Sequence, residues 1–266
     1  MSALIHPTAI IEDGARLGEN VSVSAYSIIG PNVKLGDNVT IHSHVVVGGD
    51  TEIGDGTKIF PFASIGLQPQ DLKFKGEQSK LIIGKNNTIR EHVTMNPGTE
   101  DGGMETVIGD NGLFMMACHV AHDCRIGNNV IMANNATLAG HVQVGDFVVI
   151  GGLSAVHQFI RIGHNAVIGG MSGVDTDVIP FGRVKGERAF LAGLNLIGLE
   201  RTGFGKDDIK SLQRAYKELF NGEGTMDQRI EKMAKNYEQD ELVMKVVNFA
   251  RNKKRFPLCH PVKRAS

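Results

Sequence analysis

The sequence predicts a mainly β fold: a parallel β-helix that winds short strands around a triangular core, followed by a small C-terminal α-helical domain. Two observations predict it. An aliphatic residue recurs at every sixth position over most of residues 5–174, and beyond about residue 206 the apolar spacing becomes that of a helix. A helix spaces its apolar residues by three and four and an isolated strand by two, so a period of six requires one short strand and one turn per repeat. Three repeats then close one coil of about eighteen residues.

The first elements are the six-residue repeats of residues 5–65, where the period is unbroken. Gly follows the aliphatic position in several of these repeats and suits the corners of the coil. With 41% of residues apolar, eleven matches in a stated phase arise by chance with a probability of roughly five in 100,000. The series consists of Ile5, Ile11, Leu17, Val23, Ile29, Leu35, Ile41, Val47, Ile53, Ile59 and Ile65.

The period resumes after each of two interruptions, which we call the first insertion (residues 66–82) and the second insertion (residues 96–107). A long loop that interrupts a regular coil is more often functional than without function. Each aliphatic side chain that points into the coil contributes roughly 1.5–3 kcal/mol before ordering entropy is subtracted, so some two dozen sustain a core. The later series consists of Ile83, Ile89, Met95, Ile108, Phe114, Val120, Ile126, Met132, Leu138, Val144, Ile150, Val156, Ile162, Ile168 and Val174.

The last part of the chain is predicted to be helical and to cap the open end of the coil. The expected helices are one at residues 207–220, one after the capping-box pair Thr225 and Gln228, and one at residues 242–250. We therefore divide the chain into a β-helix domain, residues 1–190, and a C-terminal helical domain, residues 191–266.

Composition limits the classes of partner and the compartment. The formal net charge of −1 over 266 residues gives no global attraction to nucleic acid or to anionic membrane. The chain starts without a basic segment that leads into an apolar one, and its longest apolar stretch, residues 147–160, is interrupted by glycines and polar residues. We therefore expect no signal peptide and no membrane span. Three cysteines are an odd number and suit a reducing compartment, so we expect a cytoplasmic location.

Chemistry-bearing residues fall into register in the predicted coil. Residues eighteen positions apart lie above one another, so the sequence itself predicts which distant residues form columns. Burying unsatisfied imidazoles costs energy, so a cluster of histidines and a carboxylate within three successive coils indicates a functional site. The residues that converge are His122, Asp123, Gly140, His141, His157 and Gln158.

The segments around these residues resemble the active-site region of the UDP-N-acetylglucosamine acyltransferases. The matching stretches are residues 116–127 and 134–142, with further matches at 63–66, 70–73, 155–159, 169–174 and 201–204. The resemblance covers nearly the whole chain and implies a left-handed coil, a handedness that the period alone does not determine. It also implies a homotrimer with active sites between adjacent subunits, because the coil edge alone leaves the cleft half-built.

The resemblance implies transfer of an (R)-3-hydroxyacyl chain from acyl carrier protein to the 3-hydroxyl of UDP-N-acetylglucosamine, the first step of lipid A biosynthesis. No cofactor and no metal are expected. The related N-acyltransferases carry an extra N-terminal uridine-binding domain, whereas the repeat here begins by Ile5, which favours the O-acyltransferases. The residues themselves leave open whether the acceptor presents a hydroxyl or an amine at its 3-position.

Three residues match the family's catalytic positions. A sugar hydroxyl needs a base, which neutral His122 can supply, although spacing alone does not distinguish it from His119. Asp123 matches the carboxylate that orients the ring; neighbours on an extended strand point to opposite sides, so a corner position is required to bring the pair together. Gly140 has no side chain to block approach, and its backbone N–H can face the developing oxyanion.

The remaining matches are expected to contact the substrates. In the polar first insertion we expect sugar recognition, with a solvated loop as the alternative; elsewhere on the coil we expect residues that line the cleft, with half-buried solvated histidines as the alternative. Between the coil and the helical domain we expect nucleotide contacts, with plain surface residues as the alternative. Gly170 matches the position that limits acyl length, where a small residue leaves room for a longer chain, although glycine at a corner also serves backbone shape. The substrate-binding candidates are Gln70, Asp71, Lys73, His119, His141, His157, Gln158, Asn195 and Arg201.

The chain departs from the enterobacterial pattern at Thr202, where a second arginine is common, and at Asn96–Pro97, where His-Arg occurs. These departures affect the residues expected to bind phosphate and to dock the carrier. A basic tail is a candidate surface for the acidic carrier protein, although such runs are usually just solvated. It consists of Lys253, Lys254, Arg255, Lys263 and Arg264.

Two rival functions remain. A zinc-dependent lyase resembling the γ-class carbonic anhydrases shares the coil architecture and would use His119, His122 and His141 as ligands across an interface. A non-catalytic six-residue-repeat scaffold would tolerate replacement of His122. Zinc analysis separates the lyase from the acyltransferase, and the replacement separates the scaffold.

Overall fold

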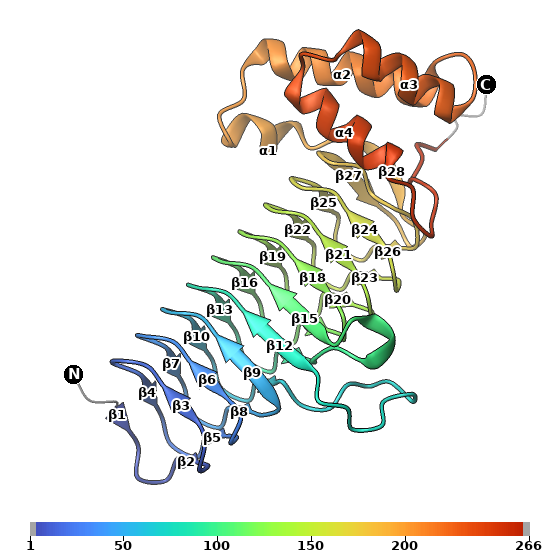
Figure 1. Ribbon diagram of the computed structural model, residues 1–266. Helices are drawn as coiled ribbons and strands as arrows, with labels where there is room; N and C mark the ends of the chain where they lie inside the picture. The colour runs from blue at the N-terminus through green and yellow to red at the C-terminus, as the bar shows by residue number, and fades with distance from the viewer. Residues whose placement is uncertain (1–3, 263–266) are drawn as a thin grey trace.

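The computed structural model describes residues 4–262 and confirms the predicted fold, a left-handed parallel β-helix with helices at its C-terminal end (Figure 1). Three parallel sheets form the faces of a triangular prism. Strands pair with the coil above and below, as in the eighteen-residue offset between Leu4 and Ser22. We call the faces sheets A, B and C, and the edges between them AB, BC and CA, in the order in which the chain turns each corner.

Sheet A is the longest face and ends in the antiparallel pair β27 and β28. In order along the prism it contains β1 (Leu4–Ile5), β4 (Ser22–Val23), β7 (Thr40–Ile41), β10 (Lys58–Ile59), β13 (Thr88–Ile89), β16 (Leu113–Phe114), β19 (Ile131–Met132), β22 (Val149–Ile150), β25 (Val167–Ile168), β27 (Gly182–Lys185) and β28 (Phe190–Leu194).

Sheets B and C form the other two faces. Sheet B contains β2 (Ile10–Ile11), β5 (Ile28–Ile29), β8 (Val46–Val47), β11 (Ser64–Ile65), β14 (Thr94–Met95), β17 (His119–Val120), β20 (Thr137–Leu138), β23 (Ala155–Val156) and β26 (Gly173–Val174). Sheet C contains β3 (Arg16–Leu17), β6 (Lys34–Leu35), β9 (Asp50–Ile53), β12 (Lys80–Ile83), β15 (Glu105–Ile108), β18 (Arg125–Ile126), β21 (Gln143–Val144) and β24 (Arg161–Ile162).

The aliphatic residues of the six-residue series fill the prism. Ile29, Ile65 and Ile150 are fully buried, whereas Ile5 and Ile11 in the first coil are only partly buried because no coil covers them from below. A single hydrophobic core therefore extends from the second coil into the helical part. The period of six positions every strand, and through the strands it positions the corners.

The corners place one residue per turn in the left-handed backbone region. On the CA edge this is mostly Asn, which tolerates that conformation. On the AB edge, side chains larger than the Gly that suits a corner adopt this conformation, among them Tyr26, His44, Phe62 and His92, with φ between 59° and 65°. Their rings stack at centroid distances of 5.1–5.2 Å, so contacts between coils offset the cost of the backbone conformation.

Both insertions leave the coil at the BC edge and project to the same side (Figure 1). The second insertion contains a single 3₁₀ turn, η1 (Glu100–Gly102). The two insertions touch, since Lys73 Nζ lies 3.0 Å from Asp101 Oδ2 and the Glu100 N–H donates to Glu77 Oε1.

The helical part contains α1 (Leu196–Arg201), α2 (Lys206–Asn221), α3 (Met226–Asn236) and α4 (Glu241–Arg251). The capping box of Thr225 and Gln228 is confirmed, and α1 is a short helix that the sequence pattern did not predict. None of the described helices is long and apolar enough to cross a membrane.

Arg161 joins the last coil to the helices. Its guanidinium lies 2.7 Å from the fully buried Asp177 carboxylate, packs over the Phe249 ring at 4.4 Å, and donates to the Asn252 carbonyl just beyond α4. The chain after α4 then returns along the coil, where Asp177 pairs with Leu258 in a β-bridge. This return brings the C-terminal segment down to the BC edge.

Candidate active site

His122 and Asp123 form a hydrogen-bonded pair at the BC edge, between β17 and β18. Asp123 has a φ of 60°, so the chain turns at this point and the two neighbouring side chains face each other instead of pointing apart. His122 Nδ1 lies 2.7 Å from Asp123 Oδ2. The required corner position is therefore present. Because the carboxylate accepts from Nδ1, the Nε2 atom of His122 is left to act on a ligand.

The Asp123 carboxylate is buried and fully supplied with donors. Asp123 is 5% exposed, and the Thr99 N–H and hydroxyl donate to its Oδ1 and Oδ2 at 2.9 and 2.6 Å. Burial alone would raise the pKa of Asp123, but the hydrogen bonds from His122 and Thr99 outweigh burial and hold the pKa below its usual range. The carboxylate is thus ionised at neutral pH and fixed in place.

Gly140 lies one coil above His122. A Cβ built on Gly140 would stand 2.5 Å from His122 Cε1 and 2.7 Å from Nε2, so any side chain here would collide with the imidazole. The Gly140 N–H donates to no residue that the structure describes, while its carbonyl accepts from the Phe159 N–H at 3.1 Å. An unpaired backbone donor therefore lies beside the candidate base.

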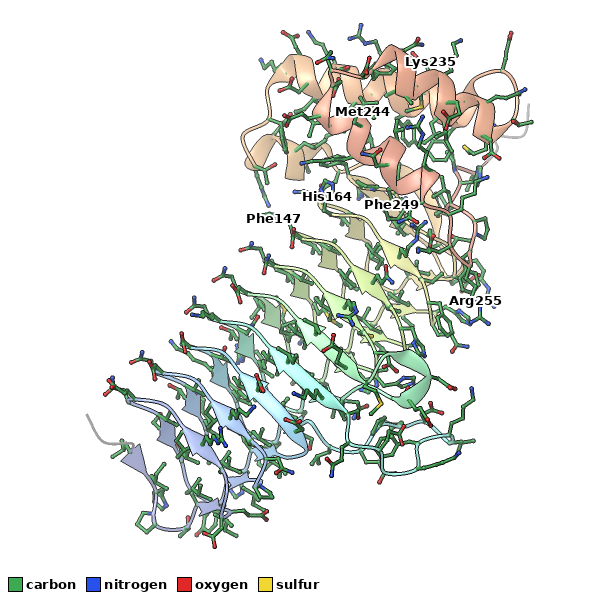
Figure 2. The ribbon with its side chains drawn as sticks, viewed as in Figure 1. Phe147, His164, Lys235, Met244, Phe249 and Arg255 are labelled. Atoms are coloured by element: carbon green, nitrogen blue, oxygen red, sulfur yellow. The ribbon has the colours of Figure 1, made fainter. Side chains whose placement is uncertain are left out.

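His141 and Phe159 extend the site toward the helices. The His141 ring stacks on Phe159 at 4.2 Å and meets the His122 ring edge-on at 5.1 Å. Burial lowers the pKa of His141 despite the Asp123 carboxylate nearby, so its imidazole is neutral at neutral pH. Arg255 from the returning C-terminal segment covers the far face of Phe159 at 4.3 Å, and Figure 2 places Arg255 beside the coil.

The first insertion also reaches the hydrogen-bonded pair of His122 and Asp123, which we call the dyad. Asp71 Oδ2 lies 4.0 Å from His122 Nε2, too far for a hydrogen bond and close enough to share a hydroxyl placed between them. Lys73 is paired with Asp101, and Gln70 is exposed on the loop. Of the three residues predicted in this insertion, only Asp71 contacts the dyad.

The other predicted residues do not join this cluster. His119 lies on β17 and bonds Thr94 through Nδ1 at 2.7 Å; burial, and then repulsion from His122, lower its pKa. His157 packs against Phe256, and Gln158 is exposed beside it on the same edge.

Asn195 and Arg201 lie at a different edge. The Asn195 side chain caps α1 and donates to the Asn165 carbonyl on the CA edge, and Arg201 is exposed at the end of the same helix. Gly170 lies on the AB edge, where a Cβ would meet nothing nearer than the Gly152 carbonyl at 3.3 Å. The predicted residues thus occupy all three edges of one prism.

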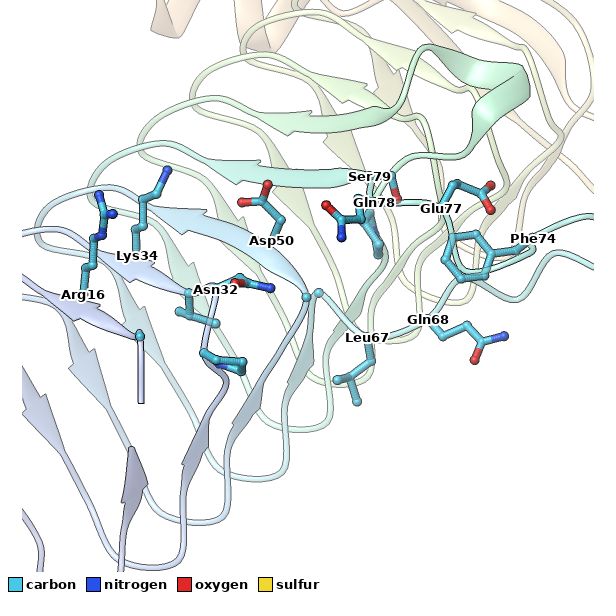
Figure 3. A pocket seen from close by; sticks show the side chains of 16 residues that line it. Arg16, Asn32, Lys34, Asp50, Leu67, Gln68, Phe74, Glu77, Gln78 and Ser79 are labelled. Carbon is cyan, nitrogen blue, oxygen red and sulfur yellow. The ribbon is translucent and has the colours of Figure 1, made fainter. Parts of the chain in front are cut away.

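The sequence pattern missed two features of the BC edge. One is the contact of Thr99 with Asp123, because Thr99 lies in an insertion that does not follow the six-residue period. The other is a pocket of about 570 Å³ between the first insertion and the coils nearer the N-terminus (Figure 3). Its walls include Arg16 and Lys34 from the coil and Phe74 from the insertion, and it does not include the dyad.

The same cluster offers possible metal ligands. Among residues 4–262, His122, Asp123 and His141 present ligand atoms within 4.8 Å of one another. The zinc alternative had named His119 in place of Asp123, but His119 Nδ1 is hydrogen-bonded to the Thr94 hydroxyl. Both Asp123 oxygens already accept strong hydrogen bonds, which suits an orienting carboxylate better than a metal ligand.

Comparison with known proteins identifies the family. A model described as UDP-N-acetylglucosamine O-acyltransferase, domain 2, matches residues 177–259, and a model described as bacterial transferase hexapeptide (six repeats) matches residues 14–49 and 105–140. A Rickettsia canadensis protein named acyl-[acyl-carrier-protein]–UDP-N-acetylglucosamine O-acyltransferase is 54% identical over 96% of this chain and 97% of its own length. A Methylobacterium radiotolerans protein of the same name is 57% identical over 97% of this chain and 94% of its own length.

Solved structures agree in both fold and name. The UDP-N-acetylglucosamine acyltransferase from Campylobacter jejuni superposes with a TM-score of 0.91 at 44% identity, covering 98% of this chain and 100% of that one. Another crystal structure of a UDP-N-acetylglucosamine acyltransferase superposes with a TM-score of 0.94 at 41% identity, covering 97% and 99%. Relatives that are more than half identical over nearly the full length, and solved structures with the same fold, lead to one conclusion: the chain belongs to the UDP-N-acetylglucosamine O-acyltransferase family.

Proposed function

We propose that the chain transfers an (R)-3-hydroxyacyl group from acyl carrier protein to the 3-hydroxyl of UDP-N-acetylglucosamine, the first step of lipid A biosynthesis. The observation that carries this proposal is the His122–Asp123 dyad beside the unpaired N–H of Gly140. The names of the relatives supply the two substrates, and the site supplies the groups that acyl transfer needs.

In this mechanism His122 Nε2 takes the proton of the sugar 3-hydroxyl as its oxygen attacks the thioester carbonyl. Asp123 stabilises the imidazolium that results. The carbonyl oxygen becomes an oxyanion, which the Gly140 N–H stabilises as a donor already in place. Collapse of the tetrahedral intermediate breaks the carbon–sulfur bond, and the departing thiolate takes the proton back from His122.

Substrate contacts follow from position. Asp71 is placed to hold an acceptor hydroxyl near Nε2, and Lys73 can turn to the sugar nucleotide if it leaves Asp101. On the BC edge, His141, His157 and Gln158 line the approach of the carrier arm. The basic tail supplies the docking surface for the acidic carrier through Lys253, Lys254 and Arg255; Lys263 and Arg264 lie outside the described residues.

The acyl tail is expected at the AB edge. Gly170 carries no side chain there, and the exposed apolar side chains of the same edge include Met116, Leu153 and Met171. Exposed apolar residues in one row favour contact with a chain of methylenes or with another subunit. A small residue at 170 leaves room for a longer chain.

A homotrimer would bring together candidate site residues that lie on different edges of one chain. Asn195 and Arg201, the proposed nucleotide contacts, lie on the CA edge, whereas the dyad lies on the BC edge, so one chain cannot present both to one substrate. A neighbour related by a threefold axis can bring its CA edge to the first chain's BC edge, which yields three equivalent sites. We place the reaction in the cytoplasm, in keeping with the buried free thiols Cys118, Cys124 and Cys259.

The test is an acyl-transfer assay with 3-hydroxyacyl carrier protein and UDP-N-acetylglucosamine. Wild-type protein should form the 3-O-acylated product, and His122→Ala should lower kcat by about 10²–10⁴-fold because the general base is gone. The exposed His6→Ala is the matched control and should retain full activity. Equal product from His122→Ala and wild type would refute the mechanism and favour a scaffold. Bound zinc in protein purified without a chelator, together with no acyl transfer by the wild type, would favour the zinc-dependent lyase.

A further inference from the structure

The geometry points to Thr99, in the second insertion, as a positioning residue that fixes the Asp123 carboxylate for the dyad. This inference rests on the proposed function, because it assigns the second insertion a part in the same reaction. Among the described residues Thr99 hydrogen-bonds the Asp123 side chain and makes no hydrogen bond to His122, so its effect would pass through Asp123.

The contacts of Thr99 are directed at the carboxylate from two atoms. Its N–H donates to Asp123 Oδ1 at 2.9 Å, and its hydroxyl donates to Oδ2 at 2.6 Å, the same oxygen that receives His122 Nδ1 at 2.7 Å. Thr99 is 3% exposed and Asp123 5%, so no bulk water competes for these bonds. Two donors from one residue leave the carboxylate no freedom to rotate away from the imidazole.

The hydroxyl of Thr99 is diverted from the role that its backbone position predicts. Thr99 is the N-cap residue of η1, where a threonine hydroxyl usually accepts from a backbone N–H of the first turn. Here no such cap bond forms. Instead the Thr99 carbonyl accepts from the N–H groups of Gly102 and Met104, which holds the turn closed and leaves the hydroxyl to Asp123.

Gly102 closes the same turn over the carboxylate. A Cβ built on Gly102 would lie 1.9 Å from Asp123 Cγ and about as close to both of its oxygens, so the backbone of η1 packs directly on the carboxylate. On the other side, the Asp123 N–H donates to the buried hydroxyl of Thr106. The second insertion therefore covers the Asp123 carboxylate and supplies its hydrogen-bond donors.

Three variants test the role of the hydroxyl. Thr99→Val keeps the shape and removes the donor, and it should lower kcat about tenfold while the KM values of both substrates change less than about twofold. Thr99→Ser keeps both donors and should restore kcat to within about threefold of wild type. Gly102→Ala displaces the carboxylate by contact and should lower kcat at least as far as Thr99→Val.

The matched control is Thr57→Val. Thr57 is fully buried at another corner, where its hydroxyl donates to the Gly84 carbonyl and accepts from the Asn87 N–H. Thr57→Val should lower the thermal unfolding midpoint at least as much as Thr99→Val and leave kcat unchanged. A kcat for Thr99→Val equal to wild type, or a Thr99→Ser as slow as Thr99→Val, would overturn the inference.

A second readout does not depend on turnover. Diethyl pyrocarbonate modifies exposed imidazole nitrogens, and peptide mass spectrometry gives the rate at His122 relative to exposed His6 in the same sample. At a fixed pH, Thr99→Val should slow modification of His122 toward the rate in Asp123→Asn, because the carboxylate no longer orients the ring. An unchanged modification rate at His122 would overturn the positioning role, whether or not the wild-type protein transfers an acyl group. Absence of acyl transfer by the wild type, with a slower modification rate in Thr99→Val, would count against the proposed function alone.

Discussion

At the scale of single residues, the site depends on the absence of one side chain. Gly140→Ala should lower kcat/KM by about 10²–10³-fold, because the added Cβ would stand 2.5 Å from His122 Cε1 and would displace the imidazole from the oxyanion donor. Steady-state kinetics of the acyl transfer measure this. Gly30→Ala on the same edge is the control, since its Cβ would come no nearer than 3.3 Å to any neighbour, the Gly48 Cα. A Gly140→Ala enzyme as active as Gly30→Ala would remove Gly140 from the mechanism.

Buried imidazoles make stability depend on pH. Burial lowers the pKa of His141, His119 and His164, with repulsion from His122 as a smaller cause at His119. The unfolded chain therefore takes up protons at a higher pH than the folded chain does. The stability gained by keeping these rings neutral is complete above the ordinary histidine pKa of about 6.5 and is lost as pH falls below it.

The thermal unfolding midpoint should accordingly be about several degrees lower at pH 5.5 than at pH 7.5. Scanning calorimetry at both values checks this, and His164→Gln should narrow the difference. A midpoint that rises on acidification would contradict the sign of all three shifts.

The residue scale also shows where prediction from sequence succeeds and fails. The columns of His122 with Gly140 and of Asp123 with His141 followed from counting eighteen residues, since each coil stacks on the next without slippage. Thr99 could not be found in this way, because an insertion has no period and its conformation depends on contacts with the coil. The ion pair of Lys73 with Asp101, which joins the two insertions, could not be predicted for the same reason.

At the scale of elements, the six-residue period predicted the β-helix, its two interruptions and the change to helices near residue 206. It did not predict the short α1, because six residues carry too little periodicity, nor the ring-stacked AB corners, whose stability comes from contacts between coils. The division at residues 190 and 191 stays a prediction, because β27 and β28 continue sheet A while leading into the helices.

The junction between coil and helices should depend on one buried ion pair. Arg161→Ala leaves the Asp177 carboxylate buried without its partner and should reduce the free energy of unfolding by about 3–5 kcal/mol, measured by urea denaturation. Arg125→Ala, in the same sheet, breaks the exposed pair with Glu105 and should cost less than about 1 kcal/mol. Equal losses in the two variants would show that Arg161 does not hold the junction.

At the scale of the whole molecule, the proposed function requires that two chains meet at the site. The dyad lies on the BC edge, Asn195 is bonded to the CA edge at the start of the helix that ends in Arg201, and the apolar row with Gly170 lies on the AB edge. A prism with different chemistry on each edge is suited to a threefold assembly, because rotation brings unlike edges together.

Activity of mixed trimers tests this account most directly. His122→Ala and Arg201→Ala, each impaired by itself, are co-expressed with different tags, and trimers that carry both tags are isolated and sized by light scattering. The account predicts recovered acyl transfer of about one third of the wild-type rate, because in every trimer that carries both tags one of the three interfaces pairs an intact dyad with an intact Arg201. Mixed trimers no more active than the two single variants, or a monomer in light scattering, would contradict it.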